Sequence, residues 1–225
     1  MECQRVLKIE KQVVKEIGFR ILDKQSQSNM RFTLLPDPRY RKHFSSLLDR
    51  LDKAAKLITR ETFNDFADDL MTTVLEDSFN AAGADEGTLW LVNSSKRELD
   101  AVFNNGPAAK KMREISQTLD RGLISMVFST GQPFCENSIE QNPEHDEAVD
   151  SQIGLPTTAM IAVPFYFAQQ CRGIISCVRL SKPGSVSSRR GFDMESMREV
   201  NRASSLLTRL FDFKLISRII GYGHN

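Results

Sequence analysis

The chain has 225 residues, 40% of them hydrophobic and 26% charged, which is an ordinary composition for a globular protein that can bury a core without disulfides or metals. Its 30 Lys and Arg residues nearly balance 29 Asp and Glu residues, and the formal net charge of +1 argues against nucleic acid as the main partner. No apolar run approaches the length of a membrane span and the charged N-terminus lacks a signal peptide, so we expect a cytoplasmic protein with no membrane partner.

Residues 1–40 are predicted to form a helical extension and linker. Over residues 1–23, apolar side chains recur every three or four positions, which is typical of an amphipathic helix. These are Val6, Ile9, Val13, Ile17 and Ile21. The polar stretch 25–29 and the prolines at 36 and 38 follow, and a helix cannot continue through those prolines.

Residues 41–221 are predicted to form one domain with long flanking helices. The first helical segment covers about residues 41–82 and ends at Gly83. A break is expected at Thr59 or Thr62, because Thr62 followed by Asp65 resembles a helix start. The last helix is predicted over residues 193–220. Its apolar seam has near-heptad spacing and consists of Met197, Val200, Ser204, Leu207, Phe211 and Leu215.

The middle of the domain carries the strand patterns. A hairpin is predicted from strands at 88–92 and 99–103, and a second from strands at 158–167 and 173–180. Between them we expect helices over 108–118 and from about 120 to 131, a short strand at 133–136, and a loop with one helical turn over 137–154. A further loop is expected over 181–190. Paired neighbouring strands mixed with helices favour an α+β fold with an antiparallel sheet.

Three stretches, in order, resemble the GAF family. They are ADEGTLWLVNSSKRELDAVFNNG (84–106), LDRGLISMVFSTGQPFCENS (119–138) and MIAVPFYFAQQCRGIISCVRLSK (160–182). The resemblance spans about residues 63–215. It implies a GAF-like, PAS-related antiparallel sheet with long N- and C-terminal helices packed on one face. The opposite face would enclose a small-molecule pocket, and in many relatives the helices also form a parallel dimer, which agrees with the apolar seam above.

The ligand motifs of two branches of the family are incomplete here. Cyclic-nucleotide-binding relatives often carry an Asn-Lys pair after the last strand, then a Phe followed four residues later by Asp-Glu. Lys182 and Phe192 match that pattern, whereas Ser181, Ser196 and Met197 replace the Asn, Asp and Glu. Bilin-binding relatives attach their chromophore through a Cys that is commonly next to a His, and this chain has no Cys-His dipeptide. The sequence therefore identifies no cofactor.

Six residues are weak candidates for ligand contacts in the expected pocket. They are Phe134, Cys135, His145, Thr158, Met160 and Phe165. His145 lies in the loop expected to cover the pocket, and its alternative reading is a surface histidine among acidic neighbours. Cys135 has the alternative reading of a buried structural thiol. Trp90 is read first as a core residue, and it would serve as a fluorescence reporter if it faced the pocket.

No catalytic or metal site is predicted. The sequence contains no nucleophile elbow, Walker loop or HExxH string, and its three histidines are scattered. We therefore expect a non-catalytic sensor or regulatory domain that forms a homodimer through its long helices, binds a small molecule and acts on a protein partner. Two alternatives stay open: a pure interaction module without a ligand, and a free methionine sulfoxide reductase that uses Cys135, Cys171 and Cys177.

Overall fold

The computed structural model describes residues 19–21, 34–36, 39, 41–181 and 191–222, and the chain divides into two compact units, Met1–Leu51 and Asp52–Asn225. In the first unit, strand β1 (Phe19–Ile21) pairs antiparallel with β2 (Leu34–Pro36). The helix predicted over residues 1–23 is therefore wrong at 19–21, where ladder hydrogen bonds to a distant segment override the local helical pattern. Residues 1–18 and the loop residues 182–190 lie outside the described ranges.

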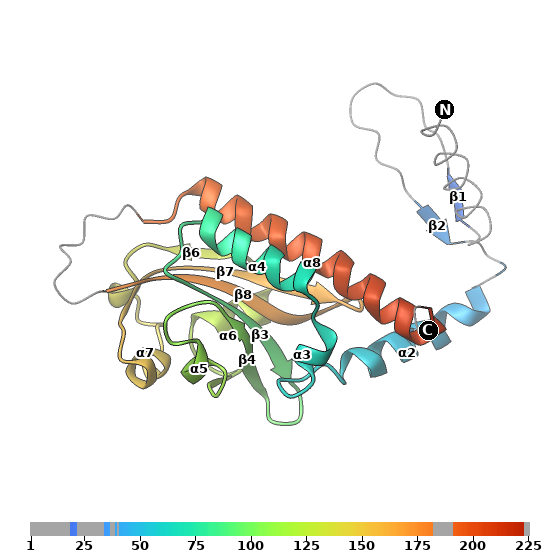
Figure 1. Cartoon of the computed structure of the whole chain (residues 1–225), viewed down its shortest axis with the longest axis horizontal. Coiled ribbons are helices and arrows are strands. Elements are labelled where there is room, and N and C mark those ends of the chain that lie inside the picture. The colour runs from blue at the N-terminus through green and yellow to red at the C-terminus, as the bar shows by residue number, and fades with distance from the viewer. Residues whose placement is uncertain (1–18, 22–33, 37–38, 40, 182–190, 223–225) are drawn as a thin grey trace, which may run out of the picture. The chain divides into compact units, whose positions relative to one another are not determined.

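The second unit is built on a six-stranded antiparallel sheet (Figure 1). The strands are β3 (Glu86–Asn93), β4 (Glu98–Asn104), β5 (Ser116–Thr118), β6 (Phe134–Glu136), β7 (Thr157–Phe167) and β8 (Gln170–Leu180). Their order across the sheet is β5-β4-β3-β8-β7-β6. Both predicted hairpins and the short strand are thus confirmed, and the fold class is α+β as expected. The long strand β7 lies inside the sheet, between β8 and β6, and is covered on both faces, which explains why it is apolar along nearly its whole length.

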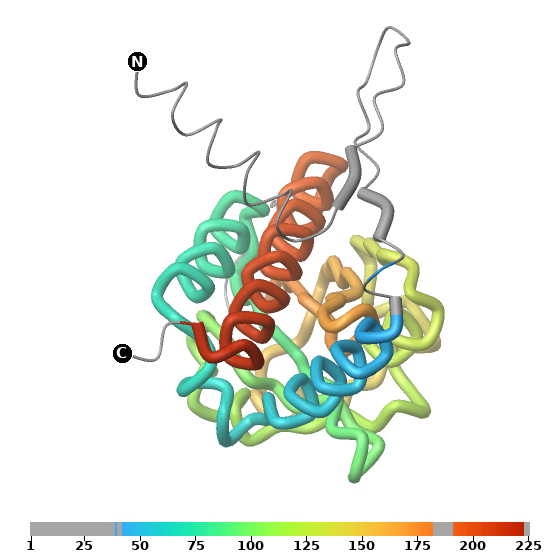
Figure 2. The backbone as a smooth tube through the Cα atoms, turned by 90° about the vertical axis from the view of Figure 1, so that its right-hand side faces the viewer, coloured from blue at the N-terminus to red at the C-terminus, as the bar shows by residue number. Residues whose placement is uncertain are grey.

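Two helices cover one face of this sheet, α4 (Asp69–Ala81) and α8 (Met194–Ile220). Figure 2 shows them lying side by side across the strands. Asp68 caps the start of α4 by accepting a hydrogen bond from the Met71 N–H, and Asp193 caps α8 in the same way. Gly221 ends α8 with a left-handed backbone at φ 72°. The predicted last helix is confirmed almost residue for residue.

The segment predicted as one helix with a break consists of three helices. They are α2 (Arg41–Ala55), the single-turn α3 (Phe63–Phe66) and α4. Thr62 does precede a helix, but its hydroxyl donates to the Leu57 carbonyl at 2.5 Å instead of capping α3. The residue that caps the next long helix is Asp68, which the sequence analysis did not single out.

The face beneath α8 is held by phenylalanine rings. Phe211 lies at the centre, with its ring centroid 4.9 Å from those of Phe66 and Phe165 and 5.1 Å from that of Phe167. Phe63 completes the cluster at 6.5 Å. Offset and tilted ring contacts of this kind stabilise a core beyond the area they bury.

The apolar seam predicted for α8 packs inside the chain. All its members except Met197 are buried: Val200, Ser204, Leu207, Phe211 and Leu215. This seam is therefore the core-facing side of the helix, and assigning it to a dimer interface was wrong. Another side of α8 carries exposed apolar residues, namely Leu206, Phe213, Ile216 and Ile220.

Short helices cover the opposite face of the sheet. They are α5 (Ala109–Met112), α6 (Leu123–Thr130), the 3-10 helix η2 (Ile139–Gln141) and α7 (Ala148–Ile153). The helix predicted over 108–118 is wrong in its second half, because residues 116–118 form β5 and complete the sheet edge beside β4. Among the described residues, no helix is long and apolar enough to cross a membrane.

Candidate functional site

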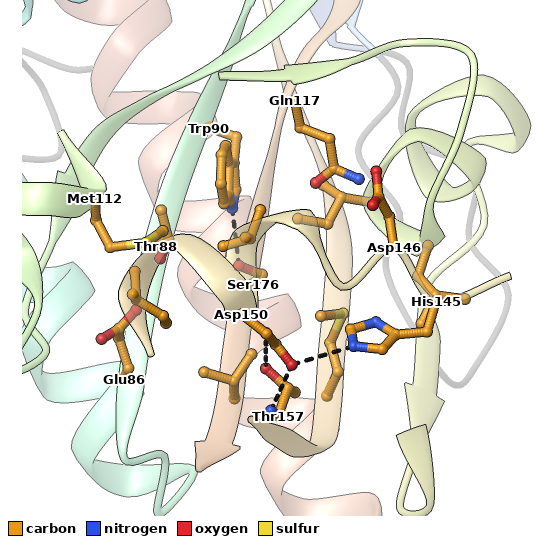
Figure 3. Close-up of a pocket in the computed structure, with 16 residues that line it drawn as sticks. Glu86, Thr88, Trp90, Met112, Gln117, His145, Asp146, Asp150, Thr157 and Ser176 are labelled. Atoms are coloured by element: carbon orange, nitrogen blue, oxygen red, sulfur yellow. Dashed lines mark hydrogen bonds and ion pairs between the residues drawn. The ribbon is translucent and has the colours of Figure 1, made fainter. Parts of the chain in front are cut away.

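A cavity of about 40 Å³ lies between the sheet and its short helices. Figure 3 shows the sixteen residues that line it, drawn from strands, helices and one loop. The strands supply Glu86, Thr88, Trp90, Gln117, Thr157, Met160, Ser176 and Val178. The remainder are Met112, Leu123, Ile124, His145, Asp146, Val149, Asp150 and Ile153. The cavity is thus half built by the sheet and half by segments that cover it.

Alternation along β3 places three side chains on this face: Glu86, Thr88 and Trp90. The Trp90 indole N–H donates to the Ser176 hydroxyl on β8 at 2.9 Å, and both residues are buried. The Thr88 hydroxyl accepts a hydrogen bond from the Asn104 amide at 2.8 Å. Trp90 is therefore both a core residue, as expected, and a wall of the cavity.

The covering segment is fastened to the sheet through Asp150. One oxygen of its carboxylate accepts the Thr157 N–H at 2.7 Å and lies 3.2 Å from the His145 ring nitrogen Nε2, and the other accepts the Thr157 hydroxyl at 2.8 Å. Beside it, Asp146 pairs with the guanidinium of Arg121 at 3.1 Å. We refer to residues 145–157 as the lid. The Asp146 pair ties the start of the lid to Arg121, and the Asp150 contacts hold α7 to His145 and to Thr157, the first residue of β7.

A larger hollow lies on the outer side of the lid. Its volume is about 390 Å³, and it shares His145, Asp150 and Thr157 with the inner cavity. The other residues around it are Glu140, Glu147, Ser151, Gly154 and Pro156. The three shared residues therefore line both the inner cavity and the hollow.

Glu86 is the most unusual group in the cavity. Its side chain is only 2% exposed, and its oxygen Oε2 has no hydrogen-bond partner. Burial raises the pKa of the Glu86 carboxyl, although hydrogen bonds from the Asn104 side chain and the Ala108 N–H oppose the rise. Gly106 leaves room for the carboxylate, since a Cβ there would lie 2.2 Å from Oε2. Sequence reasoning missed Glu86, although an acid alternating with Thr88 and Trp90 in an apolar strand was the available signal.

Two of the six predicted ligand residues, His145 and Met160, line the cavity. Phe134 is partly buried and packs against the core cluster on this face without reaching the cavity. Cys135 neighbours it on β6 and is exposed, so its reading as a buried structural thiol was wrong.

The other two predicted residues, Thr158 and Phe165, are displaced by strand geometry. An irregularity in β7 between Thr157 and Ala159 turns Thr157 into the cavity, and the Thr158 hydroxyl instead donates to the Arg179 carbonyl at 3.2 Å. Phe165 lies on the helix-covered face against Phe211. Neither side chain lines the cavity: the irregularity shifts the face of Thr158, and regular alternation puts Phe165, five residues from Met160, on the opposite face.

The three cysteines of the described residues do not form a thiol centre in the cavity. Cys177 is fully buried, Cys171 is partly buried, and none of the three lines the cavity. Desolvation raises the pKa of each thiol, most of all that of Cys177. A raised pKa disfavours the thiolate that cysteine redox chemistry requires. Across the described ranges, no group of three or more His, Cys, Asp and Glu side chains is arranged to hold a metal ion.

Comparison with family models finds no match for this chain, and comparison with curated protein sequences finds none either. Among solved structures, the fold is similar to the GAF domain of a phosphoenolpyruvate-protein phosphotransferase from Coxiella burnetii. The TM-score is 0.53 and the identity 18%, over 77% of this chain and 98% of that one. The chain has a GAF-like fold.

Two other similar structures have different roles. One is a free methionine-R-sulfoxide reductase from Neisseria meningitidis, solved with its substrate, with a TM-score of 0.50 and 15% identity over 71% of this chain and 87% of that one. The other is residues 122–287 of a methyl-accepting chemotaxis protein, with a TM-score of 0.50 and 15% identity over 65% of this chain and 85% of that one. At such identities the likeness concerns the fold alone, and function has to be argued from the site.

Proposed function

We propose that this chain is a non-catalytic regulatory domain of the cytoplasm that senses a small molecule in the inner cavity and acts as a homodimer on a protein partner. The observation that carries the proposal is the cavity itself. It is a space lined equally by polar and apolar side chains and covered by the lid, on the face of the sheet that α4 and α8 leave to the short helices. Enclosed pockets with a few convergent polar groups are the usual form of small-molecule sites.

Binding requires the lid to move. A buried water needs about 10–15 Å³ of such volume, so the cavity of about 40 Å³ admits only a few waters while the lid is closed. A larger ligand would have to displace the residues that line both spaces, His145, Asp150 and Thr157. Ligand binding then favours a different lid position, which is the differential interaction that a sensor needs.

Strand β7 offers the route from the cavity to α8. Its residue Met160 lines the cavity. Farther along the same strand, the Pro164 carbonyl accepts the Ser204 hydroxyl at 2.9 Å, and the Tyr166 carbonyl accepts the Thr208 hydroxyl at 2.6 Å. A shift of β7 on ligand binding would therefore act directly on α8.

The proposed homodimer forms through a stripe of exposed apolar residues on α8. Leu206, Phe213 and Ile220 lie seven residues apart on this helix, and Phe213 is 67% exposed. Seven-residue spacing keeps such side chains on one face, as in helices that pair along their length. Phe213→Asp should shift the protein from dimer to monomer in sedimentation velocity. Met194→Asp is the control, because Met194 is 78% exposed but lies off the stripe. A monomeric wild-type protein would contradict this part of the proposal.

Native mass spectrometry tests the ligand. The expected result is a dimer with extra mass per chain that disappears on denaturation. A dimer without extra mass would favour the second candidate function, a pure interaction module. The small closed volume of about 40 Å³ is the observation in favour of that alternative.

The reductase is the third candidate and has the least support, because no described cysteine lines the cavity. Its test is thiol-dependent turnover of free methionine sulfoxide by the wild type and by Cys135→Ser. Turnover that is lost in the variant would contradict a non-catalytic role.

A further inference from the structure

We propose that the ligand of the inner cavity carries a small cationic head, a primary ammonium group, which is bound by Glu86. This inference rests on the proposed function, since it assumes that the cavity takes up a small molecule. It specifies the chemical class of that molecule from the charges and hydrogen bonds of the residues that line the cavity.

The charges around the cavity have one sign. Three carboxylate side chains line it, those of Glu86, Asp146 and Asp150, and none of the sixteen lining residues is Lys or Arg. Arg121, which does not line the cavity, pairs with Asp146 through its guanidinium, and its side chain is 66% exposed. A narrow space with acidic walls and little water concentrates a negative potential, which attracts cations and repels anions.

The entrance has the same sign. The outer hollow adds Glu140 and Glu147 to the shared Asp150, and no Lys or Arg is among the eight residues around it. A cation that approaches the lid therefore meets acidic groups both before and behind His145. An anionic ligand would be repelled along the same route.

Glu86 differs from the other two acids because its hydrogen bonding is incomplete. Asp150 accepts two hydrogen bonds from Thr157 and contacts His145, while Asp146 pairs with Arg121. The buried oxygen Oε2 of Glu86 has no donor. Burying a carboxylate oxygen without a donor is unfavourable, and an ammonium group would provide both the missing donor and the opposite charge.

The volume of the inner cavity fits the head group of a ligand whose remaining atoms lie outside this cavity. The inner cavity of about 40 Å³ has room for a group of one or two heavy atoms such as methylammonium. A longer molecule would extend past His145 and Asp150 into the hollow of about 390 Å³. Glu86 and Trp90 both line this cavity, from the two ends of the row that Glu86, Thr88 and Trp90 form on β3, so Trp90 reports on what enters it (Figure 3).

Tryptophan fluorescence provides the test, because Trp90 is the only tryptophan in the chain. The full chain is titrated with methylammonium chloride, and separately with potassium chloride, sodium acetate and methanol, at constant ionic strength. We expect a saturable change in Trp90 emission with methylammonium alone. In Glu86→Gln, the apparent Kd should rise roughly tenfold to a hundredfold, the range for loss of a charge-assisted hydrogen bond. Glu76→Gln, an exposed acid on α4, is the matched control and should bind as the wild type does.

Circular dichroism establishes that the variants are folded, and Glu86→Asp, which keeps the charge on a shorter side chain, should bind more tightly than Glu86→Gln. Equal binding by wild type and Glu86→Gln would overturn the proposal. So would saturable binding of acetate or methanol, or no saturable response to methylammonium. Native mass spectrometry separates this failure from failure of the proposed function. A co-purified anionic or neutral molecule would refute the cationic head group but not the proposal that the domain binds a small molecule. A protein without bound molecule that responds to no probe would refute both.

Discussion

The two faces of the sheet are built from different chemistry. Beneath α8, rings from α3, β7 and α8 meet around Phe211. On the other face, Trp90, Glu86 and Asp150 surround a space that is not filled. The comparison teaches that both faces contain an apolar core, while the cavity face also keeps buried polar groups and volume that a stability-optimised core would not contain.

The largest effect on this comparison is expected from removing the Phe211 ring, which lies at the centre of the face covered by α8. Phe211→Ala should lower the free energy of unfolding by about 3–5 kcal/mol, because it deletes a fully buried aromatic side chain and leaves a cavity. Urea denaturation measures the change. Met194→Ala on the same helix is exposed and should change stability by less than about 0.5 kcal/mol. A similar small loss for Phe211→Ala would mean that the ring cluster does not dominate this face.

A second prediction concerns the lid. Asp150→Ala removes the acceptor of the Thr157 N–H and hydroxyl, and should lower stability by about 2 kcal/mol. Hydrogen exchange should become faster over residues 145–157 before it does in β3 or β8. Glu147→Ala is the control, since this neighbour is exposed. Unchanged exchange in the Asp150 variant would show that the lid is held by other contacts.

The hydrogen bond between Trp90 and Ser176 permits a finer test. Ser176→Ala leaves the buried indole N–H without an acceptor and should lower stability by about 1.5 kcal/mol. The double variant Trp90→Phe/Ser176→Ala should lose less than the sum of the two single losses, because the orphaned donor is then absent. Additive losses in urea denaturation would indicate that the hydrogen bond is not formed.

The smallest effect is expected from the charge on Glu86, and it depends on pH. Burial raises the pKa of this carboxyl above its ordinary value, so the folded protein holds the proton to higher pH than the unfolded chain does. The stability contributed by protonated Glu86 is complete below the ordinary pKa of glutamate and is lost as pH rises through the raised value. Glu86→Gln should remove this part of the pH dependence. Relative to the wild type, the free energy of unfolding of the variant should therefore be higher at pH 7 than at pH 4. Parallel stability curves for wild type and variant would contradict an elevated pKa.

The main elements could be read from the sequence because their patterns are local. Runs of β-forming residues bounded by turns gave β3, β4, β7 and β8, and the spacing of apolar residues gave the extent of α8. His145 and Met160 were placed in the cavity for the same reason: one lies in the covering loop and the other on a regular part of β7. Short elements such as β5 could not be read, because residues 116–118 become a strand only by pairing with β4.

The sequence by itself determined the antiparallel α+β architecture and the class of fold, since hydrophobic periodicity and turn residues act over a few positions. Only the tertiary structure decided which side of the sheet each side chain occupies. The irregularity at Thr157 and Ala159 sends Thr157 rather than Thr158 into the cavity, and Phe165 turns to Phe211. The tertiary structure also decided that the buried oxygen Oε2 of Glu86 has no hydrogen-bond donor and that the apolar seam of α8 packs in the core of the domain. Burial, desolvation and the choice of partner depend on segments far apart in the chain, which no local pattern encodes.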